Sequence, residues 1–213
     1  MIIQWLGHSC FLLTSAGGVR VLADPFDPKI GYPAPAVEAD IVTTSHQHSD
    51  HNYTAVVKGN FTTVSTPGSV TLKGIEILGV PTFHDDADGK QRGQNLLFRL
   101  TIDGLHVLHC GDLGHALTPE QVKAVGAVDV LLVPVGGHFT VDAATALGVM
   151  RALRPAVTIP MHFKTPALDF PITTVEPFLE VAGGGRQAGS TQVELTAANL
   201  AQQAGVLVLD YPH

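Results

Sequence analysis

Four side chains that can bind a metal ion fall within six residues of this chain, in the segment 46–51 (HQHSDH). The run 40–44 (DIVTT) before it is typical of a β-strand, so the segment is expected in the loop at the carboxyl end of that strand. His46 and His48 can share one ion, and the turn carries Asp50 and His51 toward a second. Two ions roughly 3.5–4 Å apart, bridged by water and a carboxylate, form a hydrolytic site. The motif predicts such a site, and the alternative is a polar turn that holds three histidines by chance.

Three further side chains of the same kind each stand just beyond a strand-like run. His84 follows 79–83 (GVPTF), Asp112 follows 105–111 (LHVLHCG) and His162 follows 158–161 (TIPM). Histidine is the commonest metal-binding side chain at neutral pH, and the chain has 11 histidines against 12 lysines and arginines. The pattern predicts that these three side chains join the segment 46–51 in one metal centre.

The composition bounds the class of protein. A chain of 213 residues with 45% hydrophobic and 15% charged residues is expected to form one globular domain over 1–213. A net charge of −7 with no basic run argues against nucleic-acid and anionic-membrane partners and favours a small-molecule substrate. Cys10 and Cys110 lie in apolar runs, as buried reduced thiols do. With no segment of signal-peptide or membrane-span character, a cytoplasmic protein is expected.

Strand-like runs fill the first half, and strands alternate with helices in the second. Strands are expected at 9–14, 19–23, 40–44, 75–80, 95–102, 105–109, 128–133, 156–161 and 206–210. The pair Asp103-Gly104 predicts a hairpin between two of these runs. Helices are expected from Thr118 to Val125 and, capped by Asp142, over 143–153. The order indicates an α/β or α+β layered domain with parallel strand pairing in its second half.

From Leu6 to about Pro166 the sequence resembles the metallo-β-lactamase superfamily. The resemblance is carried by Asp24 after a strand, by the HxHxDH segment, and by the later single residues His84, Asp112 and His162. It implies a four-layer αββα sandwich of two mixed sheets with helices outside. It also implies that His46, His48 and His84 hold a first metal, that Asp50, His51 and His162 hold a second, and that Asp112 bridges the two.

The flanking residues resemble one branch of that superfamily, the small stand-alone hydrolases related to ascorbate-6-phosphate lactonase. The shared segments are 5–9 (WLGHS), 83–85 (FHD), 111–114 (GDLG) and 159–162 (IPMH). The third histidine stands in Phe-His-Asp where other members have Gly-His-Thr, so either His84 or another histidine completes the first site. His48 occupies the position at which flavodiiron oxygen reductases carry a glutamate, which disfavours redox chemistry.

The activity that follows is a two-metal hydrolase whose metal-held hydroxide attacks a lactone or phosphodiester in preference to a β-lactam. Zinc is the first expectation for both ions, with manganese, iron and nickel open. Asp50 is expected to orient the nucleophile, and Asp24 to fix a ligating imidazole. The alternatives are a non-catalytic metal- or ligand-binding protein on the same fold and an iron-dependent oxygenase. The substrate and the oligomeric state stay open.

Other polar residues are candidates for contact with the substrate. They are His8, Asn95, His115, His138 and Lys164, with Arg92 as a further anion-binding charge. A structural hydrogen-bonding role is the alternative for His8, and a structural role is expected for His106 and His109. The polar segment 85–95 is either a surface loop or a lid over the site. The terminal His213 is expected to be solvated.

Overall fold

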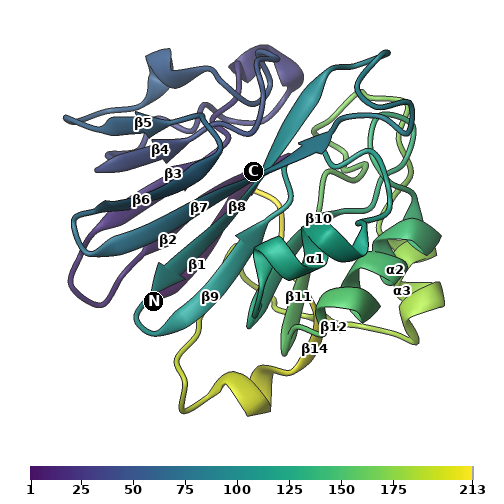
Figure 1. Ribbon diagram of the computed structural model, residues 1–213. Helices are drawn as coiled ribbons and strands as arrows, with labels where there is room; N and C mark the ends of the chain where they lie inside the picture. The colour runs from purple at the N-terminus through teal and green to yellow at the C-terminus, as the bar shows by residue number, and fades with distance from the viewer. Residues whose placement is uncertain (213) are drawn as a thin grey trace.

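Two β-sheets pack face to face in the computed structural model, which describes residues 1–212 and leaves His213 outside the described part (Figure 1). Within that part the first sheet has the strand order β13 (Gln192–Glu194), β1 (Ile2–Gly7), β2 (Cys10–Thr14), β3 (Arg20–Ala23), β4 (Ile41–Thr43) and β5 (Thr62–Val64). The second has the order β12 (Arg186–Gln187), β14 (Gly205–Val208), β11 (Val157–Met161), β10 (Val130–Pro134), β9 (Leu105–His109), β8 (Gln94–Ile102), β7 (Ile75–Phe83) and β6 (Gly68–Leu72).

Both sheets are mixed. In the first sheet β1, β2 and β3 pair antiparallel, whereas β3, β4 and β5 pair parallel. In the second sheet β6 to β9 form an antiparallel meander, and β9, β10, β11 and β14 are parallel as the sequence predicts. The hairpin at Asp103-Gly104 is confirmed, because both residues have the positive φ angles, 51° and 78°, that a type I′ turn requires.

The main core lies between the two sheets. Trp5, Phe11 and Leu13 from the first sheet belong to the same buried cluster as Phe98 and Val107 from the second. Strands with alternate buried positions supply these side chains, since successive residues of a strand point to opposite faces. Burial of so much apolar surface fixes how the two sheets sit on each other, and with them the strand ends that carry polar residues.

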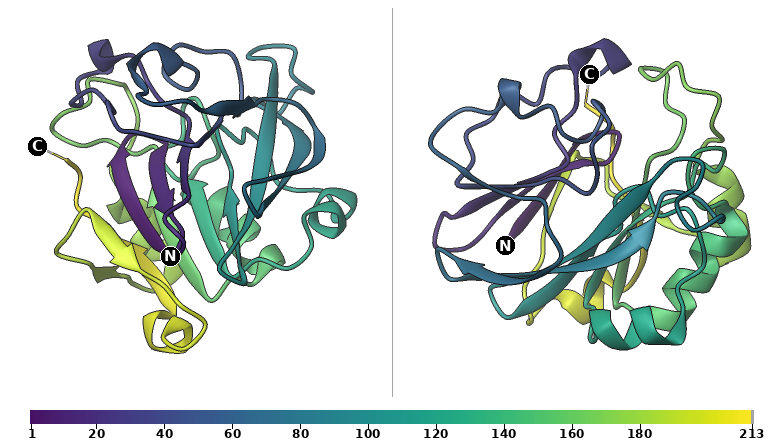
Figure 2. Two further views of the ribbon diagram at one scale, coloured as in Figure 1. Left: turned by 90° about the vertical axis from the view of Figure 1, so that its left-hand side faces the viewer. Right: turned by 45° about the horizontal axis from the view of Figure 1, so that its top comes forward.

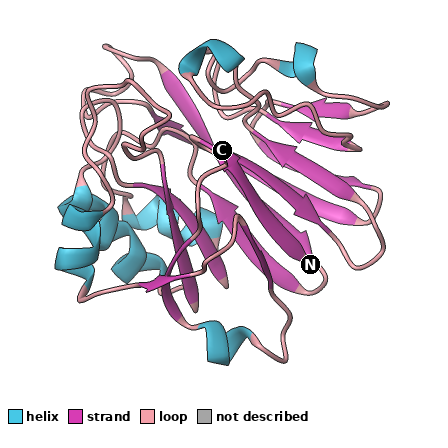
Figure 3. Cartoon of the chain, turned by 180° about the vertical axis from the view of Figure 1, so that it is seen from behind, coloured by secondary structure: helices cyan, strands magenta, loops and turns pink. Residues whose placement is uncertain are grey.

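The three α-helices of residues 1–212, α1 (Pro119–Val125), α2 (Ala143–Leu153) and α3 (Glu176–Ala182), gather beside the second sheet (Figures 2 and 3). Helices α1 and α2 begin at the predicted capping residues, with Thr118 forming a full capping box. Neither these helices nor any other in residues 1–212 has the length and apolar character needed to cross a membrane.

The outer face of the first sheet is covered by loops and short turns. Phe26 and Tyr32, from the proline-rich segment 25–39, pack with Leu22 and Val42 of that sheet in a second buried cluster. Two 3₁₀ turns, η1 (Pro28–Ile30) and η2 (Thr54–Val56), lie in these covering loops, and a third, η3 (Leu200–Gln203), precedes β14. The sandwich fold is confirmed, with its α-helices concentrated on one side.

Some elements were not among the sequence expectations. The edge strands β5, β6, β12 and β13 are short and mostly exposed, so they lack the alternation that marks a strand. Strand β1 was not predicted, and the strand-like runs 75–80 and 79–83 form one strand, β7. Helix α3 was not predicted, because it spans only seven residues between a proline-rich segment and the triple glycine 183–185.

We expect Asp142→Ala to destabilise the protein by about 1 kcal/mol, because the Asp142 carboxylate caps α2 by accepting a hydrogen bond from the Thr145 amide at 2.8 Å. That bond lowers the pKa of Asp142, so its stabilising effect is present above the unfolded-state pKa and is lost as pH falls through the folded-state pKa. Urea unfolding near neutral pH and in acid measures both effects. Asp142→Asn keeps a capping oxygen and is the control; equal losses for both variants would contradict the capping role.

Candidate metal centre

Polar side chains collect at one end of the sandwich, just past the carboxyl ends of five strands. Asp24 follows β3, the segment 45–51 follows β4, His84 follows β7, Asp112 follows β9 and His162 follows β11. The backbone turns sharply at two of these points, where Asp24 and His162 have φ angles of 49° and 50°. The distant residues singled out from the sequence therefore meet the HxHxDH loop in space.

The first cluster of possible ligands is His46, His48 and His84. One ring nitrogen of each lies within 4.8 Å of the others. His46 and His84 are buried, and His48 is exposed toward solvent. The ring centroid of His84 is 4.7 Å from that of His46 and 5.2 Å from that of His48. The structure thus brings His84, which the sequence left open, to this cluster.

The second cluster gathers around Asp112. His51 Nε2 lies 3.2 Å from Asp112 Oδ1, and His162 Nε2 lies 3.4 Å from Asp112 Oδ2. Asp50 Oδ2 is 3.9 Å from His51 Nε2. Because His84 Nε2 is also 3.2 Å from Asp112 Oδ2, this carboxylate touches both clusters.

The buried carboxylate of Asp24 orients the HxHxDH loop. It accepts hydrogen bonds from the Ser45 amide at 2.8 Å, from Ser45 Oγ at 2.5 Å and from His51 Nδ1 at 2.8 Å. Since Ser45 Oγ donates to Asp24, it accepts from His46 Nδ1, 2.9 Å away. In their neutral form, both imidazoles therefore carry the proton on Nδ1 and keep a free lone pair on Nε2. The sequence missed Ser45, whose only signal is its place directly before the motif.

Asn95 fixes the position of Asp112 by hydrogen bonds, as Asp24 does for the HxHxDH loop. Its amide donates to Thr82 Oγ1 at 2.8 Å and to the Cys110 carbonyl at 3.0 Å, and its carbonyl oxygen accepts from the Asp112 amide at 3.0 Å. Gly111 has φ 53°, and a Cβ there would lie 2.5 Å from Asn95 Oδ1, so only glycine fits. Asn95 is fully buried and points into the protein, away from the position expected of a substrate contact.

Burial and neighbouring charges act against each other in this cluster. Burial lowers the pKa of His46 to about 3, so the ring is neutral at physiological pH. Burial alone would raise the pKa of Asp112, but His162 and His51 hold it well below its usual value. Burial also disfavours the charged form of His51, yet Asp112 and Asp24 raise the pKa of His51 well above the ordinary value. The carboxylates of Asp112 and Asp24 therefore stabilise a positive charge at His51.

The donor atoms fit divalent metal ions. His46 Nε2, His51 Nε2 and Asp112 Oδ1 are buried and have no hydrogen-bond partner among residues 1–212. Buried polar atoms without partners are costly, and cations bound in the two clusters would satisfy these three. Neutral imidazoles and ionised carboxylates are the ligand forms that such ions require.

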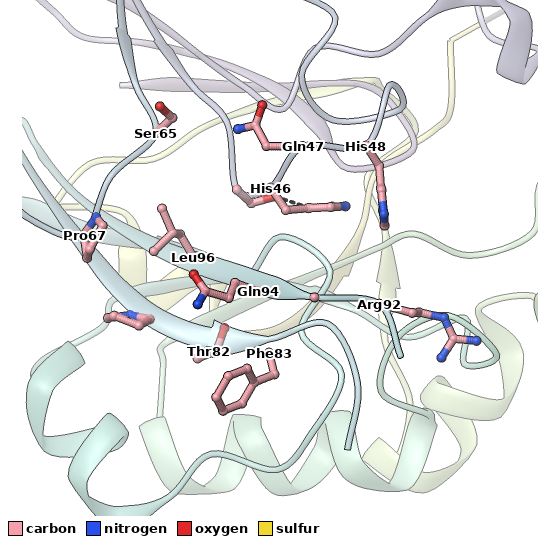
Figure 4. A pocket seen from close by; sticks show the side chains of 13 residues that line it. His46, Gln47, His48, Ser65, Pro67, Thr82, Phe83, Arg92, Gln94 and Leu96 are labelled. Atoms are coloured by element: carbon pink, nitrogen blue, oxygen red, sulfur yellow. Dashed lines mark hydrogen bonds between the residues drawn. The ribbon is translucent and has the colours of Figure 1, made fainter. Parts of the chain in front are cut away.

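Two neighbouring hollows open beside the clusters. The smaller, about 240 Å³, lies directly over them and is lined by His48, Asp50, His84, Arg92, Asp112, Phe139, His162 and Phe170; we call it the mouth. The larger, about 530 Å³, runs past His46 and His48 between the loop 65–67 and the ends of β7 and β8; we call it the groove (Figure 4). Arg92 and His48 line both. No sequence pattern pointed to Phe139 or Phe170.

Comparison with known proteins identifies the family. The family profile of the beta-lactamase superfamily domain matches residues 2–162. The chain belongs to this superfamily. A UPF0173 metal-dependent hydrolase of Thermococcus kodakarensis is 30% identical over 76% of this chain and 84% of its own length.

Solved structures are also similar to this chain. A Thermotoga maritima protein assigned to its zinc-dependent hydrolases is 41% identical, with a TM-score of 0.83 over 99% of this chain and 98% of its own. A metallo hydrolase of Ignicoccus hospitalis, 22% identical, shares the fold with a TM-score of 0.67 over 100% of this chain and 96% of its own.

The remaining candidates for substrate contact lie in different surroundings. His115 accepts a hydrogen bond from the Phe83 amide and donates to the Ala116 carbonyl, so both ring nitrogens serve the backbone. His138 is exposed and packs its ring edge-on against Phe139. Lys164 donates to Asp169 and to the Phe170 carbonyl. None of the three lines the mouth or the groove.

His106 and His109 have the structural contacts that the sequence suggests. His106 Nδ1 lies 3.1 Å from Asp129 Oδ2. His109 is buried, donates from Nε2 to the Ser9 carbonyl at 2.7 Å and accepts from the Gly111 amide.

The segment after His84 is an ordered loop tied to one carboxylate. Asp85 accepts hydrogen bonds from the backbone amides of Ala87, Gly89, Gln91 and Arg92. These bonds outweigh the effect of burial and lower the pKa of Asp85 to about 2. The loop delivers Arg92 to the mouth.

We expect Asp24→Asn to weaken metal binding by about 10- to 100-fold, because the amide cannot accept all three hydrogen bonds and His51 loses its fixed tautomer. Competition with a chromophoric chelator measures the affinity. Asp27→Asn, three residues on, changes a carboxylate that contacts the amide and the ammonium group of Lys29, and it should leave metal affinity unchanged. Equal affinities for Asp24→Asn and Asp27→Asn would refute this role.

Proposed function

We propose that this metal-dependent hydrolase holds two divalent metal ions and cleaves an ester-type bond in a small molecule, a lactone or phosphodiester in preference to a β-lactam. The observation that carries the proposal is the position of Asp112, whose two oxygens lie 3.2–3.4 Å from imidazole nitrogens of both clusters. A carboxylate between two groups of ligands is the arrangement that two-metal hydrolytic sites use.

The ligands divide between two positions. His46, His48 and His84 would hold the first ion, and Asp50, His51 and His162 the second, with Asp112 shared. Bound ions would supply a hydroxide at neutral pH and polarise the bond under attack. Zinc fits the nitrogen and oxygen donors, as do manganese, iron and nickel.

The chain's own side chains bind and orient the reactants. Asp50 is buried except for 21% of its side chain, and it lines the mouth, so its carboxylate can accept a hydrogen bond from the attacking water. Phe139 and Phe170 form the apolar part of the mouth and exclude other water. Strand and loop contacts hold each of these groups before substrate arrives, which lowers the cost of orienting them.

The mouth and groove suit a small anionic substrate. Their volumes of about 240 and 530 Å³ accommodate a small molecule. Arg92 is 5.6 Å above the Phe139 ring, and no carboxylate pairs with its guanidinium among residues 1–212. A free cation beside two metal ions favours a substrate with a phosphate or carboxylate group.

The expected surroundings are consistent with this activity. The net charge of −7 argues against a nucleic-acid partner. Cys10 and Cys110 are buried free thiols, in line with a reducing, cytoplasmic location.

We expect two metal ions per chain, loss of activity on chelation, and recovery on adding metal back. Asp112→Asn should weaken both ions, because its carboxylate touches both clusters. Elemental analysis and calorimetric titration measure this. Asp129→Asn removes a carboxylate that pairs with His106 and serves as the control. The bridged two-metal site would be refuted if the wild-type protein bound a single ion per chain, or if Asp112→Asn weakened the binding of only one of the two ions.

We expect Arg92→Gln to lower kcat/KM about tenfold for the anionic diester bis(p-nitrophenyl) phosphate and to change it little for the neutral p-nitrophenyl acetate, since a charged hydrogen bond is lost only with the first. Lys90→Gln, in the same loop but paired with Asp88 at 3.8 Å, is the matched control. An equal loss of kcat/KM with both substrates would mean that Arg92 does not bind the anionic group of the substrate.

A further inference from the structure

His8 is a buried imidazole at the metal centre that the ligand assignment above leaves unused. It stands between β1 and β2 with no exposed surface. Its ring centroid is 4.3 Å from that of His162 and 5.0 Å from that of His51. One ring nitrogen of each of these three histidines lies within 4.8 Å of the other two.

Neither nitrogen of His8 has a hydrogen-bond partner among residues 1–212. Nε2 lies 3.3 Å from Asp50 Oδ2, close enough for a hydrogen bond but not directed at that oxygen. A fully buried ring that satisfies neither of its nitrogens is unfavourable. A metal ion at these nitrogens would complete the contacts of His8.

The same signature marks two of the assigned ligands. His51 Nε2 lies 3.2 Å from Asp112 Oδ1, yet neither atom has a hydrogen-bond partner within the described chain. His46 Nε2 is likewise unpartnered, 3.9 Å from Asp112 Oδ2. These donor atoms are closely spaced but do not form hydrogen bonds with one another. A metal site without its ion has this arrangement.

We propose that His8 is a ligand of the second metal ion, beside Asp50, His51 and His162. The proposal rests on the two-metal site of the proposed function and adds a protein ligand to it. With the shared Asp112, the second ion would have five protein ligands where the first has four. Zinc sites usually have four ligands, so the second position suits an ion that accepts five or six.

The backbone holds His8 in this position. His8 has a φ of 53°, an uncommon value for a residue with a side chain. Its carbonyl accepts hydrogen bonds from Trp5 Nε1 at 2.9 Å and from the His162 amide at 3.2 Å, which ties it directly to another ligand. Gly7 before it has φ 103° and leaves room for the Tyr32 ring, which a Cβ would meet at 2.6 Å.

The ring of His8 also lies close to the mouth. The edge of the ring packs against Phe170, a lining residue of the mouth.

The competing role for His8 is a hydrogen bond donated to Asp50, which would position that carboxylate without touching metal. The two roles differ in the number of imidazoles bound. Loaded with cobalt(II), the wild-type protein should show six ligating imidazoles, counted by X-ray absorption and by paramagnetically shifted ring N–H resonances. A count of five would overturn the proposal, and this measurement needs no variant.

Variants give the second test. In His8→Gln the side chain can still donate to Asp50 but supplies no imidazole, so we expect the second cobalt ion to bind at least about tenfold more weakly and the first to be unchanged. His106→Gln, paired with Asp129 at the other end of β9, is the control. Circular dichroism of each metal-free variant establishes that it is folded. Unchanged binding of the second ion in His8→Gln would overturn the proposal.

The two proposals fail in different ways. If the wild-type protein binds fewer than two cobalt ions, the two-metal site itself is wrong. If it binds two ions through five imidazoles, the two-metal site stands and only the role of His8 is refuted.

Discussion

The buried carboxylate of Asp24 is the contact on which the candidate metal centre depends. It lies at the end of β3 and accepts three hydrogen bonds from Ser45 and His51, residues of the neighbouring strand end. A buried carboxylate is costly unless it is fully hydrogen-bonded. The bonds that satisfy Asp24 are the same ones that fix the loop and the tautomers of His46 and His51. Local stability and ligand orientation therefore have a single cause.

The fold makes this arrangement possible by placing strand ends side by side. Strands β3 and β4 are parallel neighbours in one sheet, and β9, β10 and β11 are parallel neighbours in the other. Their carboxyl ends open at the same edge of the sandwich, so residues more than a hundred positions apart, such as Asp24 and His162, meet there. The apolar core between the sheets supplies the rigidity, and the polar residues at the edge need only short loops to converge.

The sequence predicted the parts of the site that follow from strand ends and missed those that depend on tertiary contacts. The placement of His84, Asp112 and His162 could be read because each follows an apolar run. Asn95 was taken for a substrate contact, but its amide is turned inward by Thr82, Cys110 and Asp112, which no local pattern reveals. Helix α3 and the edge strands were not predicted for a related reason. Their segments are short and largely exposed, so their hydrophobic residues show little periodicity.

Chemistry and specificity come from different parts of this molecule. The possible ligands stand on strand ends whose positions the core enforces. The mouth, by contrast, is completed by Arg92, Phe139 and Phe170, which come from three separate loops. Of these, the loop of Arg92 is held by its own carboxylate, Asp85, which binds four of the loop's amides. Side chains of this loop can change without removing those bonds, because the donors to Asp85 are backbone amides. The loop is also joined to one possible ligand, since the Gly93 carbonyl accepts from the His84 amide at 3.0 Å. We therefore expect the loops to determine which substrate binds, and the residues at the strand ends to determine the hydrolytic chemistry.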